Sequence, residues 1–279
     1  MNLIVQGNDI PTPSLKHLAK LTSATVIEAI SATAFKLTSA DESLCPDVAA
    51  FCDAEALDCG WVPAERRISD FGLLVMDMDS TLITIECIDE IADMQGLKPQ
   101  VSEITEAAMR GEIDFAESLR RRVSLLAGLD QSALQRVYDE RLKLSPGAET
   151  LLATLQAAGI KTLLVSGGFT FFTERLKPRL GLDYTAANTL EIAEGKLTGR
   201  VLGDIVDAQA KADWLNRVRS DLNLAPAQVI AMGDGANDLN MMAEAGVSIA
   251  YRAKPVVRAQ ASHALNQVGL DGILPLLGH

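Results

Sequence analysis

The segment at 71–86, FGLLVMDMDSTLITIE, constrains the fold of this chain more than any other stretch. Its apolar run ends in the carboxylate of Asp77, a pattern typical of a strand that is buried on both faces. Asp79, Ser80 and Thr81 follow at once. Two carboxylates so close together at a strand end are costly unless a cation compensates them, and a divalent ion does so most simply. Taken alone, a strand followed by an Asp-rich turn explains the segment as well.

Matching pieces further along the chain favour a catalytic interpretation. A second apolar run, 160–165, is followed by Ser-Gly-Gly at 166–168, and a third, 229–232, is followed by GDGAND at 233–238. Lys211 lies between them in a helical pattern. Strands and helices alternate repeatedly, which predicts a parallel sheet with helices on both faces. Ligands of such sheets bind beyond the carboxyl ends of the strands, where these polar groups are expected.

A long insert separates the first two of these strands. The stretch of about 87–145 is far longer than a strand crossover needs. Aspartates at helix starts and glycines at helix ends divide it into four short helices, which indicates a compact helical cap. Such a cap excludes water and contacts the substrate. The fold class predicted for 71–279 is therefore α/β, a doubly wound, Rossmann-like parallel sheet that carries a helical cap.

Residues 1–70 predict a separate small α+β domain. Short strands and helices alternate there in the order βαββαβ. This order is similar to that of the ferredoxin-like ACT regulatory module, and the likeness rests on element order alone. A small appendage that merely packs on the catalytic domain explains the pattern equally well. The charged segment 63–70 is the expected linker.

Charge and hydropathy exclude several classes of partner. The chain has 37 acidic and 25 basic residues and a net charge of −12, which disfavours nucleic acid and anionic membranes. No apolar run approaches the length of a transmembrane helix, and the first residues lack the features of a signal peptide. We therefore expect a cytoplasmic protein, and a homodimer stays open.

The cysteines do not indicate a metal site. Cys45, Cys52 and Cys59 recur at every seventh residue, and Cys87 stands apart. None forms a CxxC pair and no histidine is near, so zinc binding is not indicated. On a helix this spacing places the side chains on one face, where cysteine packs as a small apolar residue.

The polar groups described above resemble the motifs of the haloacid dehalogenase-like hydrolases, a superfamily of phosphoryl-transfer enzymes. The sequence DMDST at 77–81 matches the first motif, DxDxT, while Ser166 and Lys211 match the second and third. Asp234 and Asp238 match the fourth. Within the superfamily the chain is most similar to the phosphoserine phosphatases, and the residues that carry this narrower likeness are Glu86, Met109, Phe115, Arg122, 166–168 and 233–238. The resemblance covers about 72–279.

The resemblance implies hydrolysis of a phosphate ester through an aspartyl phosphate, with one Mg²⁺ per active site. Asp77 would be the nucleophile, and Asp79 the general acid and then the general base. The carboxylates of Asp77 and Asp234 and the backbone carbonyl of Asp79 would bind the metal. Lys211 would bridge Asp77 and the phosphate, and Asp238 would orient Lys211 or the waters on the metal.

As a general acid, Asp79 needs a raised pKa. A free aspartate has a pKa near ~3.9 and gives up its proton well below neutral pH. The charge of Asp77 and closure of the cap are expected to raise the pKa of Asp79. The resemblance also implies that the Asp79 side chain points away from the metal, so that the cation does not cancel this shift.

The remaining site residues are assigned to the substrate by the resemblance. Ser166, Gly167 and Gly168 would present a hydroxyl and backbone N–H groups to the phosphate, and Asn237 would also contact the substrate. A strand-to-helix turn explains Ser-Gly-Gly as well.

The cap residues would recognise the amino-acid part of phosphoserine. Glu86 would pair with the ammonium and Arg122 with the carboxylate, while Met109 and Phe115 form a dry wall between them. Each also has an ordinary explanation: Glu86 as an acid at a helix start, Arg122 as one of three exposed arginines, and the two apolar residues as cap core.

The leading hypothesis is hydrolysis of the small molecule O-phosphoserine, the last step of serine biosynthesis. A phosphatase or phosphotransferase for another small phosphomonoester, such as phosphohomoserine, stays open. A phospho-accepting signalling receiver also uses aspartate, lysine and Mg²⁺. Receivers lack an acid two residues after the nucleophile and lack a large cap, so Asp79 and the 87–145 insert weigh against them.

Overall fold

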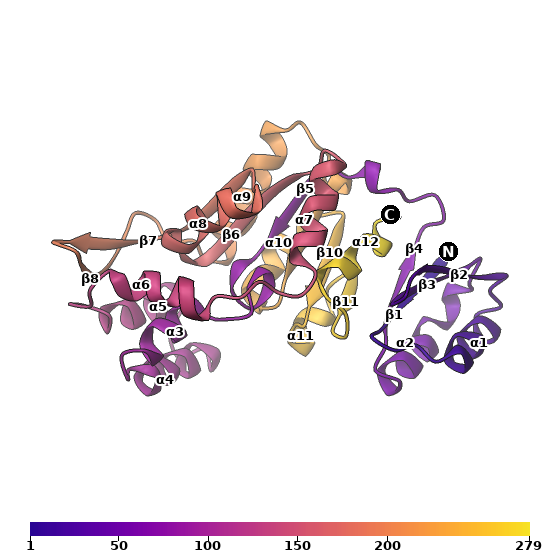
Figure 1. Ribbon diagram of the computed structural model, residues 1–279, viewed down its shortest axis with the longest axis horizontal. Helices are drawn as coiled ribbons and strands as arrows, with labels where there is room; N and C mark the ends of the chain where they lie inside the picture. The colour runs from indigo at the N-terminus through magenta and orange to yellow at the C-terminus, as the bar shows by residue number, and fades with distance from the viewer.

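The computed structural model describes residues 1–279 and contains two separate sheets (Figure 1). The first sheet belongs to a small α+β unit, made of β1 (Asn2–Gln6), α1 (Thr12–Leu21), β2 (Val26–Ser31), β3 (Ala34–Thr38), α2 (Cys45–Ala54) and β4 (Asp58–Val62). Its strands are antiparallel, in the order β2-β3-β1-β4. The βαββαβ order predicted from the sequence is confirmed. The domain boundary near residue 70 stays a prediction.

The cysteines of the small unit do not share one helical face, so that expectation is wrong. Cys45 and Cys52 lie on α2, but Cys59 lies in β4, because the chain turns between them. Cys45 is exposed, whereas Cys52 is buried in the core of the small unit. All four cysteines are free thiols.

The main sheet has seven strands in the order β11-β10-β9-β5-β6-β7-β8. Their bounds are β5 (Leu73–Met76), β6 (Lys161–Phe169), β7 (Tyr184–Ala193), β8 (Lys196–Leu202), β9 (Val229–Gly233), β10 (Val247–Tyr251) and β11 (His263–Leu265). All pairings from β11 to β7 are parallel, and only the predicted β7–β8 hairpin is antiparallel. The doubly wound, Rossmann-like parallel sheet is therefore confirmed.

Helices cover both faces of the main sheet, as the buried strand β5 requires. Leu74 and Met76 of β5 pack into one core, and Leu73 and Val75 pack into the other. The helices that enclose these cores are α7 (Ala148–Ala157), α8 (Thr170–Leu180) and α12 (Ile273–Leu276) on the first side, and α9 (Ala208–Asp221), α10 (Leu239–Ala243) and α11 (Pro255–Arg258) on the second. With apolar neighbours on both faces, β5 has no exposed position, which explains its unbroken apolar run.

The predicted helical cap is present between β5 and β6. Its helices are α3 (Cys87–Asp93), α4 (Lys98–Met109), α5 (Phe115–Ser124) and α6 (Ser132–Arg136). The side chain of Asp114 accepts a 2.7 Å hydrogen bond from the Glu117 N–H and so caps α5, as expected. The last helix of the cap changes character along its length, because α6 continues as a π-helical turn at Val137–Arg141. None of the helices combines the length and hydropathy that a membrane crossing requires.

The cap and the small unit lie at opposite ends of the main sheet (Figure 1). The small unit is attached to the other end through Asp58, whose buried carboxylate accepts three hydrogen bonds of 2.8 to 3.2 Å from the backbone N–H groups of 266–268. Gln6 adds a 2.9 Å bond from its side-chain amide to the Gly272 carbonyl. The attachment is therefore polar and specific in addition to apolar packing.

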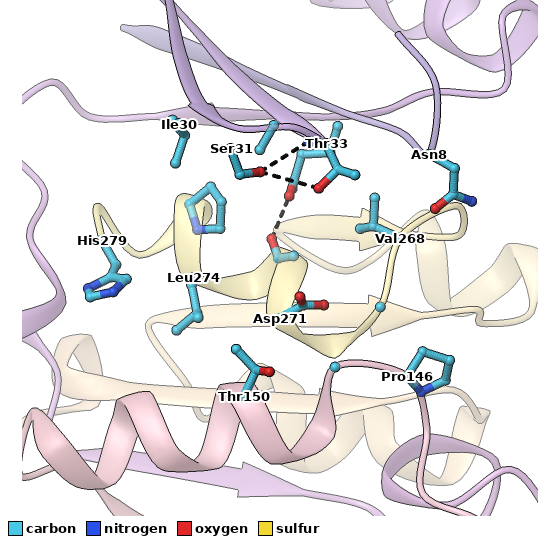
Figure 2. A pocket seen from close by; sticks show the side chains of 16 residues that line it. Asn8, Ile30, Ser31, Thr33, Pro146, Thr150, Val268, Asp271, Leu274 and His279 are labelled. Atoms are coloured by element: carbon cyan, nitrogen blue, oxygen red, sulfur yellow. Dashed lines mark hydrogen bonds between the residues drawn. The ribbon is translucent and has the colours of Figure 1, made fainter.

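A cavity of about 440 Å³ remains between the small unit and the segments around α7 and α12 (Figure 2). Ser31 and Thr33 of the β2–β3 hairpin lie on one side of it, and Thr150 and Asp271 lie on the other. The Ser31 hydroxyl accepts a 3.1 Å bond from the Thr33 N–H and is thus already engaged within the hairpin.

We predict that Asp58→Asn destabilises the whole protein. An amide cannot accept from three donors in this arrangement, so at least one buried N–H group of 266–268 loses its partner. The expected loss is about 2–3 kcal/mol in the free energy of unfolding, measured by urea denaturation. Asp53→Asn, an exposed position on α2, serves as the matched control. Equal stability of the two variants would contradict the role of Asp58.

Candidate active site

The polar groups predicted from the sequence do meet at one edge of the main sheet. Strand β5 pairs with β6 on one side and β9 on the other, so the ends of these three strands are neighbours. Asp77 follows β5 directly, and its backbone N–H donates to the Met232 carbonyl of β9 at 3.1 Å. Asp234 follows β9, and Ser166 lies toward the end of β6.

The Ser-Gly-Gly sequence lies within a strand rather than after it. We expected the second strand to end at Val165, but β6 continues to Phe169 with an irregular register between these two residues. Asn188 of β7 supports this irregular stretch, because its side-chain amide donates to the Gly167 carbonyl at 2.8 Å. Its side-chain oxygen accepts from the Val206 N–H at 2.8 Å. A single Asn in a strand gives no sequence signal for this supporting role.

Lys211 lies in the first turn of α9 and is almost fully buried, with 1% exposure. Its Nζ atom is 2.8 Å from Asp77 Oδ1 and 2.7 Å from Asp238 Oδ1. Burial lowers the pKa of Lys211, but the charges of Asp238 and Asp77 outweigh burial and raise the net pKa. The ammonium therefore stays charged in a place where an unpaired cation would not be tolerated.

Three carboxylates come together beside this lysine. Asp77, Asp234 and Asp238 each offer an oxygen atom within 4.8 Å of the others. Asp238 is already engaged, because Oδ1 pairs with Lys211 and Oδ2 accepts from the Gly235 N–H at 3.1 Å. Asp77 and Asp234 are thus the carboxylates best placed to bind a cation, and oxygen ligands of this kind suit a divalent metal ion.

The charge of this cluster is not fully compensated by protein groups. Burial raises the pKa of Asp234 to about 6, with further contributions from Asp238 and Glu86, while a 3.2 Å hydrogen bond from Thr81 works in the other direction. Burial also raises the pKa of Asp77, against the effect of Lys211. A bound cation would favour the ionised form of both carboxylates.

Asp79 has the raised pKa that a general acid needs. Its pKa is raised to about 8, first by burial and then by the charge of Glu86. Burial is the effect expected from the cap, whereas the charged neighbour is Glu86 and not the expected Asp77. Asp79 Oδ1 accepts a 3.3 Å bond from the Cys87 N–H at the start of the cap. A Cβ atom at position 168 would lie 2.8 Å from Asp79 Oδ2, which explains the glycine there.

Ser80 turns the chain from the core into the cap. Its φ angle is 55°, a left-handed conformation that non-glycine residues adopt only where the surroundings hold them. The Ser80 hydroxyl donates a 2.7 Å hydrogen bond to Glu86 Oε1. This bond fixes the carboxylate at the start of α3, a role that the sequence did not indicate.

A cavity of about 440 Å³ lies between the strand ends and the cap. The predicted residues that line it are Asp77, Asp79, Glu86, Met109, Phe115, Arg122, Ser166, Gly167, Gly168, Asp234 and Asn237. Lys211 and Asp238 do not reach its wall and lie beneath Asp77. The structure therefore brings together all the residues predicted to contact substrate, apart from Lys211. Asp89 and Lys254 also line the cavity, and no motif in the sequence marks either of them.

The cap side of the cavity differs in part from expectation. Arg122 is half-buried on α5, donates from Nε to the Ser118 carbonyl at 3.4 Å and makes no direct ion pair. Burial lowers the pKa of its guanidinium, and the charges of Asp89, Glu86 and Asp79 work against this larger effect. Phe115 contacts the strand end, since a Cβ at Gly167 would lie 2.7 Å from its ring. Met109 lines the cavity but is 68% exposed, so its place in a dry wall stays a prediction.

The fold and these motifs define the class of protein. The sequence profile of the haloacid dehalogenase-like hydrolases matches residues 74–243. The chain therefore belongs to this family, whose phosphatases generally use a metal ion and act on phosphoesters. A second profile, a domain of unknown function (DUF4072), matches residues 3–48.

The relatives narrow the comparison to one activity. The phosphoserine phosphatase of Polaromonas sp. is 56% identical over 218 residues, which cover 76% of this chain and 92% of that protein. The phosphoserine phosphatase of Albidiferax ferrireducens is 54% identical over 215 residues, which cover 75% of this chain and 91% of the relative.

Solved structures agree with this assignment. A probable phosphoserine phosphatase from Vibrio cholerae, in unliganded form, matches 99% of this chain and 86% of its own, with a TM-score of 0.86 and 41% identity. A haloacid dehalogenase family hydrolase from Salmonella enterica serovar Typhi is similar over 100% of this chain and 99% of its own, with a TM-score of 0.90 and 37% identity. A phospho-aspartyl intermediate analogue of phosphoserine phosphatase is similar over 74% of this chain and 98% of its own, with a TM-score of 0.69 and 38% identity.

We predict that divalent cations stabilise this protein through Asp234. A ligand that binds only the folded state at ~100 times its Kd adds about 2.7 kcal/mol to the free energy of unfolding. Melting the wild type with and without MgCl₂ or MnCl₂ should therefore show a clear rise in Tm. Asp234→Asn should lose most of this rise, whereas Asp213→Asn, exposed on α9, should keep it. The same rise in both variants would place the cation elsewhere.

Proposed function

We propose that this chain is a Mg²⁺-dependent phosphoserine phosphatase that hydrolyses O-phosphoserine to serine and phosphate, the last step of serine biosynthesis. Relatives of that name are 53% to 56% identical over about three quarters of the chain. The observation that carries the proposal is the cavity in which Asp77 and Asp79 face Glu86 and Arg122. The phosphoryl-transfer groups thus share one cavity with a carboxylate and a guanidinium, which can pair with the ammonium and the carboxylate of an amino acid.

Asp77 is the proposed nucleophile. Its carboxylate attacks phosphorus, a bond forms between them, and the bond from phosphorus to the serine oxygen breaks. Asp79 gives its proton to the departing serine oxygen, which its pKa of about 8 permits near neutral pH. The ionised Asp79 then takes a proton from water, whose oxygen attacks phosphorus and releases Asp77 and phosphate.

Lys211 and the metal ligands balance charge in this scheme. Lys211 stays 2.8 Å from Asp77 and offsets the negative charge that accumulates there. Asp77, Asp234 and the backbone carbonyl of Asp79 are the proposed ligands of one Mg²⁺, which supplies charge neutralisation toward the phosphate when bound. Asp238 is not assigned to the metal, because both of its oxygens already accept hydrogen bonds from protein groups; its proposed role is to orient Lys211.

The phosphate oxygens are assigned to the strand end of β6. The Ser166 hydroxyl, the N–H groups of Gly167 and Gly168, and Asn237 line the cavity beside Asp77. Asn188 holds the peptide that joins the two glycines, so the N–H of Gly168 is kept in place. In the structure the Gly168 N–H donates to Ser166 Oγ at 2.8 Å, so this bond has to be exchanged for one to a phosphate oxygen when the substrate binds.

The amino-acid part of the substrate is assigned to the cap. The Glu86 carboxylate would pair with the ammonium group, and Ser80 holds it in position. Arg122, which has no protein carboxylate within ion-pair distance, would bind the substrate carboxylate through its planar guanidinium. Met109 and Phe115 line the same wall.

The alternatives are weaker. A signalling receiver is disfavoured by membership of the hydrolase family, by Asp79 and by the cap helices. Phosphohomoserine carries the same charged groups as phosphoserine on a longer chain, so a substrate comparison must include it. A cytoplasmic location, a homodimer and a regulatory role for 1–70 stay predictions.

We predict that Asp77 and Asp79 fail in different ways when each is replaced by asparagine. Asp77→Asn should abolish turnover of O-phosphoserine, since no nucleophile remains. Asp79→Asn should lose at least about 100-fold in kcat, because proton transfer is lost, yet it should keep the rise in Tm with MgCl₂. Loss of that rise in Asp79→Asn, to the extent seen in Asp234→Asn, would show that the Asp79 side chain serves the metal.

We predict that Arg122→Ala selectively damages phosphoserine hydrolysis. A buried substrate carboxylate without its partner costs about 2–5 kcal/mol, so kcat/KM for O-phosphoserine should fall by orders of magnitude. Hydrolysis of p-nitrophenyl phosphate, which lacks that carboxylate, should barely change. Arg122→Lys should restore only part of the loss, because a point charge does not reproduce the planar donor pair.

Arg120→Ala is the matched control, since Arg120 is exposed on the same helix and lies outside the cavity. It should behave as the wild type on both substrates. Equal losses of Arg122→Ala on phosphoserine and on the aryl phosphate would assign Arg122 to folding or to phosphate binding.

A further inference from the structure

The charges around the active-site cavity leave one cation without a role. The acidic side chains that line it are Asp77, Asp79, Glu86, Asp89 and Asp234, and the basic ones are Arg122 and Lys254. Lys211 is not part of the wall. The whole chain carries a net charge of −12, so a phosphate dianion approaches through a repulsive field.

Lys254 is attached to the same loop as the proposed metal ligand. It precedes α11, and its backbone N–H donates to the Asp234 carbonyl at 3.2 Å. The following Pro255 begins the helix, where its fixed φ angle fits. The backbone of Lys254 is therefore held beside Asp234, while the side chain remains exposed and contributes to the cavity wall. No ion pair with a protein carboxylate engages the ammonium.

Lys254 and Arg122 approach the cavity from different parts of the fold. Arg122 belongs to the cap, whereas Lys254 lies in the loop between β10 and α11, where its backbone bonds to Asp234. Gly235 and Asn237 line the same cavity. The core side is where the phosphate binds under the proposed function. A lysine ammonium suits a phosphate there, because a compact charge with rotatable donors does not demand one orientation of the oxygens.

We propose that Lys254 is a substrate-binding residue that attracts the phosphate group to the active site and holds it at the core side of the mouth. This role rests on the proposed phosphatase activity, and it is separate from the chemical step. Lys254 acts on capture of the substrate, so it changes KM more than kcat. Because its side chain is exposed, its effect is screened by salt.

The test compares Lys254→Met, Lys254→Arg and a control, Arg258→Met, at constant MgCl₂. Arg258 is an exposed cation at the other end of α11 and does not line the active-site cavity. All three substitutions spare the backbone N–H that bonds to Asp234. Steady-state kcat and KM are measured with O-phosphoserine and with p-nitrophenyl phosphate, at ionic strengths of about 0.05 M and about 0.5 M.

Lys254→Met should raise KM about three- to tenfold for both substrates at low ionic strength, with kcat within about twofold of the wild type. The defect should shrink at high ionic strength. Lys254→Arg should restore KM, and Arg258→Met should match the wild type. The natural substrate could prove to be a phosphomonoester other than phosphoserine. Hydrolysis of p-nitrophenyl phosphate would then still measure how well the variants bind a phosphate group.

Three results would overturn the proposal. Identical KM values for Lys254→Met and Arg258→Met would make Lys254 an ordinary solvated lysine. A defect confined to O-phosphoserine would assign Lys254 to the amino-acid group and not to the phosphate. A loss in kcat that does not respond to salt would indicate a structural effect on the Asp234 loop.

Discussion

The active site depends on one buried ion cluster, in which Lys211 lies between Asp77 and Asp238. Removing three charges from water is costly, and good pairing is what makes it tolerable. With Asp234 included, the cluster holds three carboxylates and one ammonium. A divalent cation would balance the two excess negative charges, so the proposed metal requirement follows from the charges that the fold gathers here.

The main sheet and the cap contribute different groups to the active site. Strands β5, β6 and β9 bring the phosphoryl-transfer groups to one edge of the sheet, since parallel neighbours end on the same side. The cap adds Glu86 and Arg122 from outside the sheet. Ser80 connects the two parts, because its left-handed turn and its bond to Glu86 set where the cap begins. The small unit lies at the far end, away from this chemistry (Figure 1).

Much of this arrangement was predictable from local sequence, and the rest was not. Buried parallel strands have unmistakable apolar runs, so β5 and β9 and the acids after them were found. The bulge that places Ser166 inside β6, and its support by Asn188, arise from strand pairing that no local pattern encodes. The exposure of Met109 depends on how α4 sits over the cavity. Three short elements near the end of the chain, α11, β11 and α12, were missed because three or four residues are too few to show a period.

In the proposed mechanism Asp77 carries the phosphoryl group between substrate and water. The most direct test is to mix the protein with O-phosphoserine and Mg²⁺, quench with acid within the first turnovers, and locate the added phosphate by peptide mass spectrometry. We expect phosphate on the peptide that contains Asp77, and on no other, with the amount rising and then falling as substrate is consumed. Phosphate on a different residue, or substrate turnover with no phosphorylated peptide at any time, would show that Asp77 is not the nucleophile.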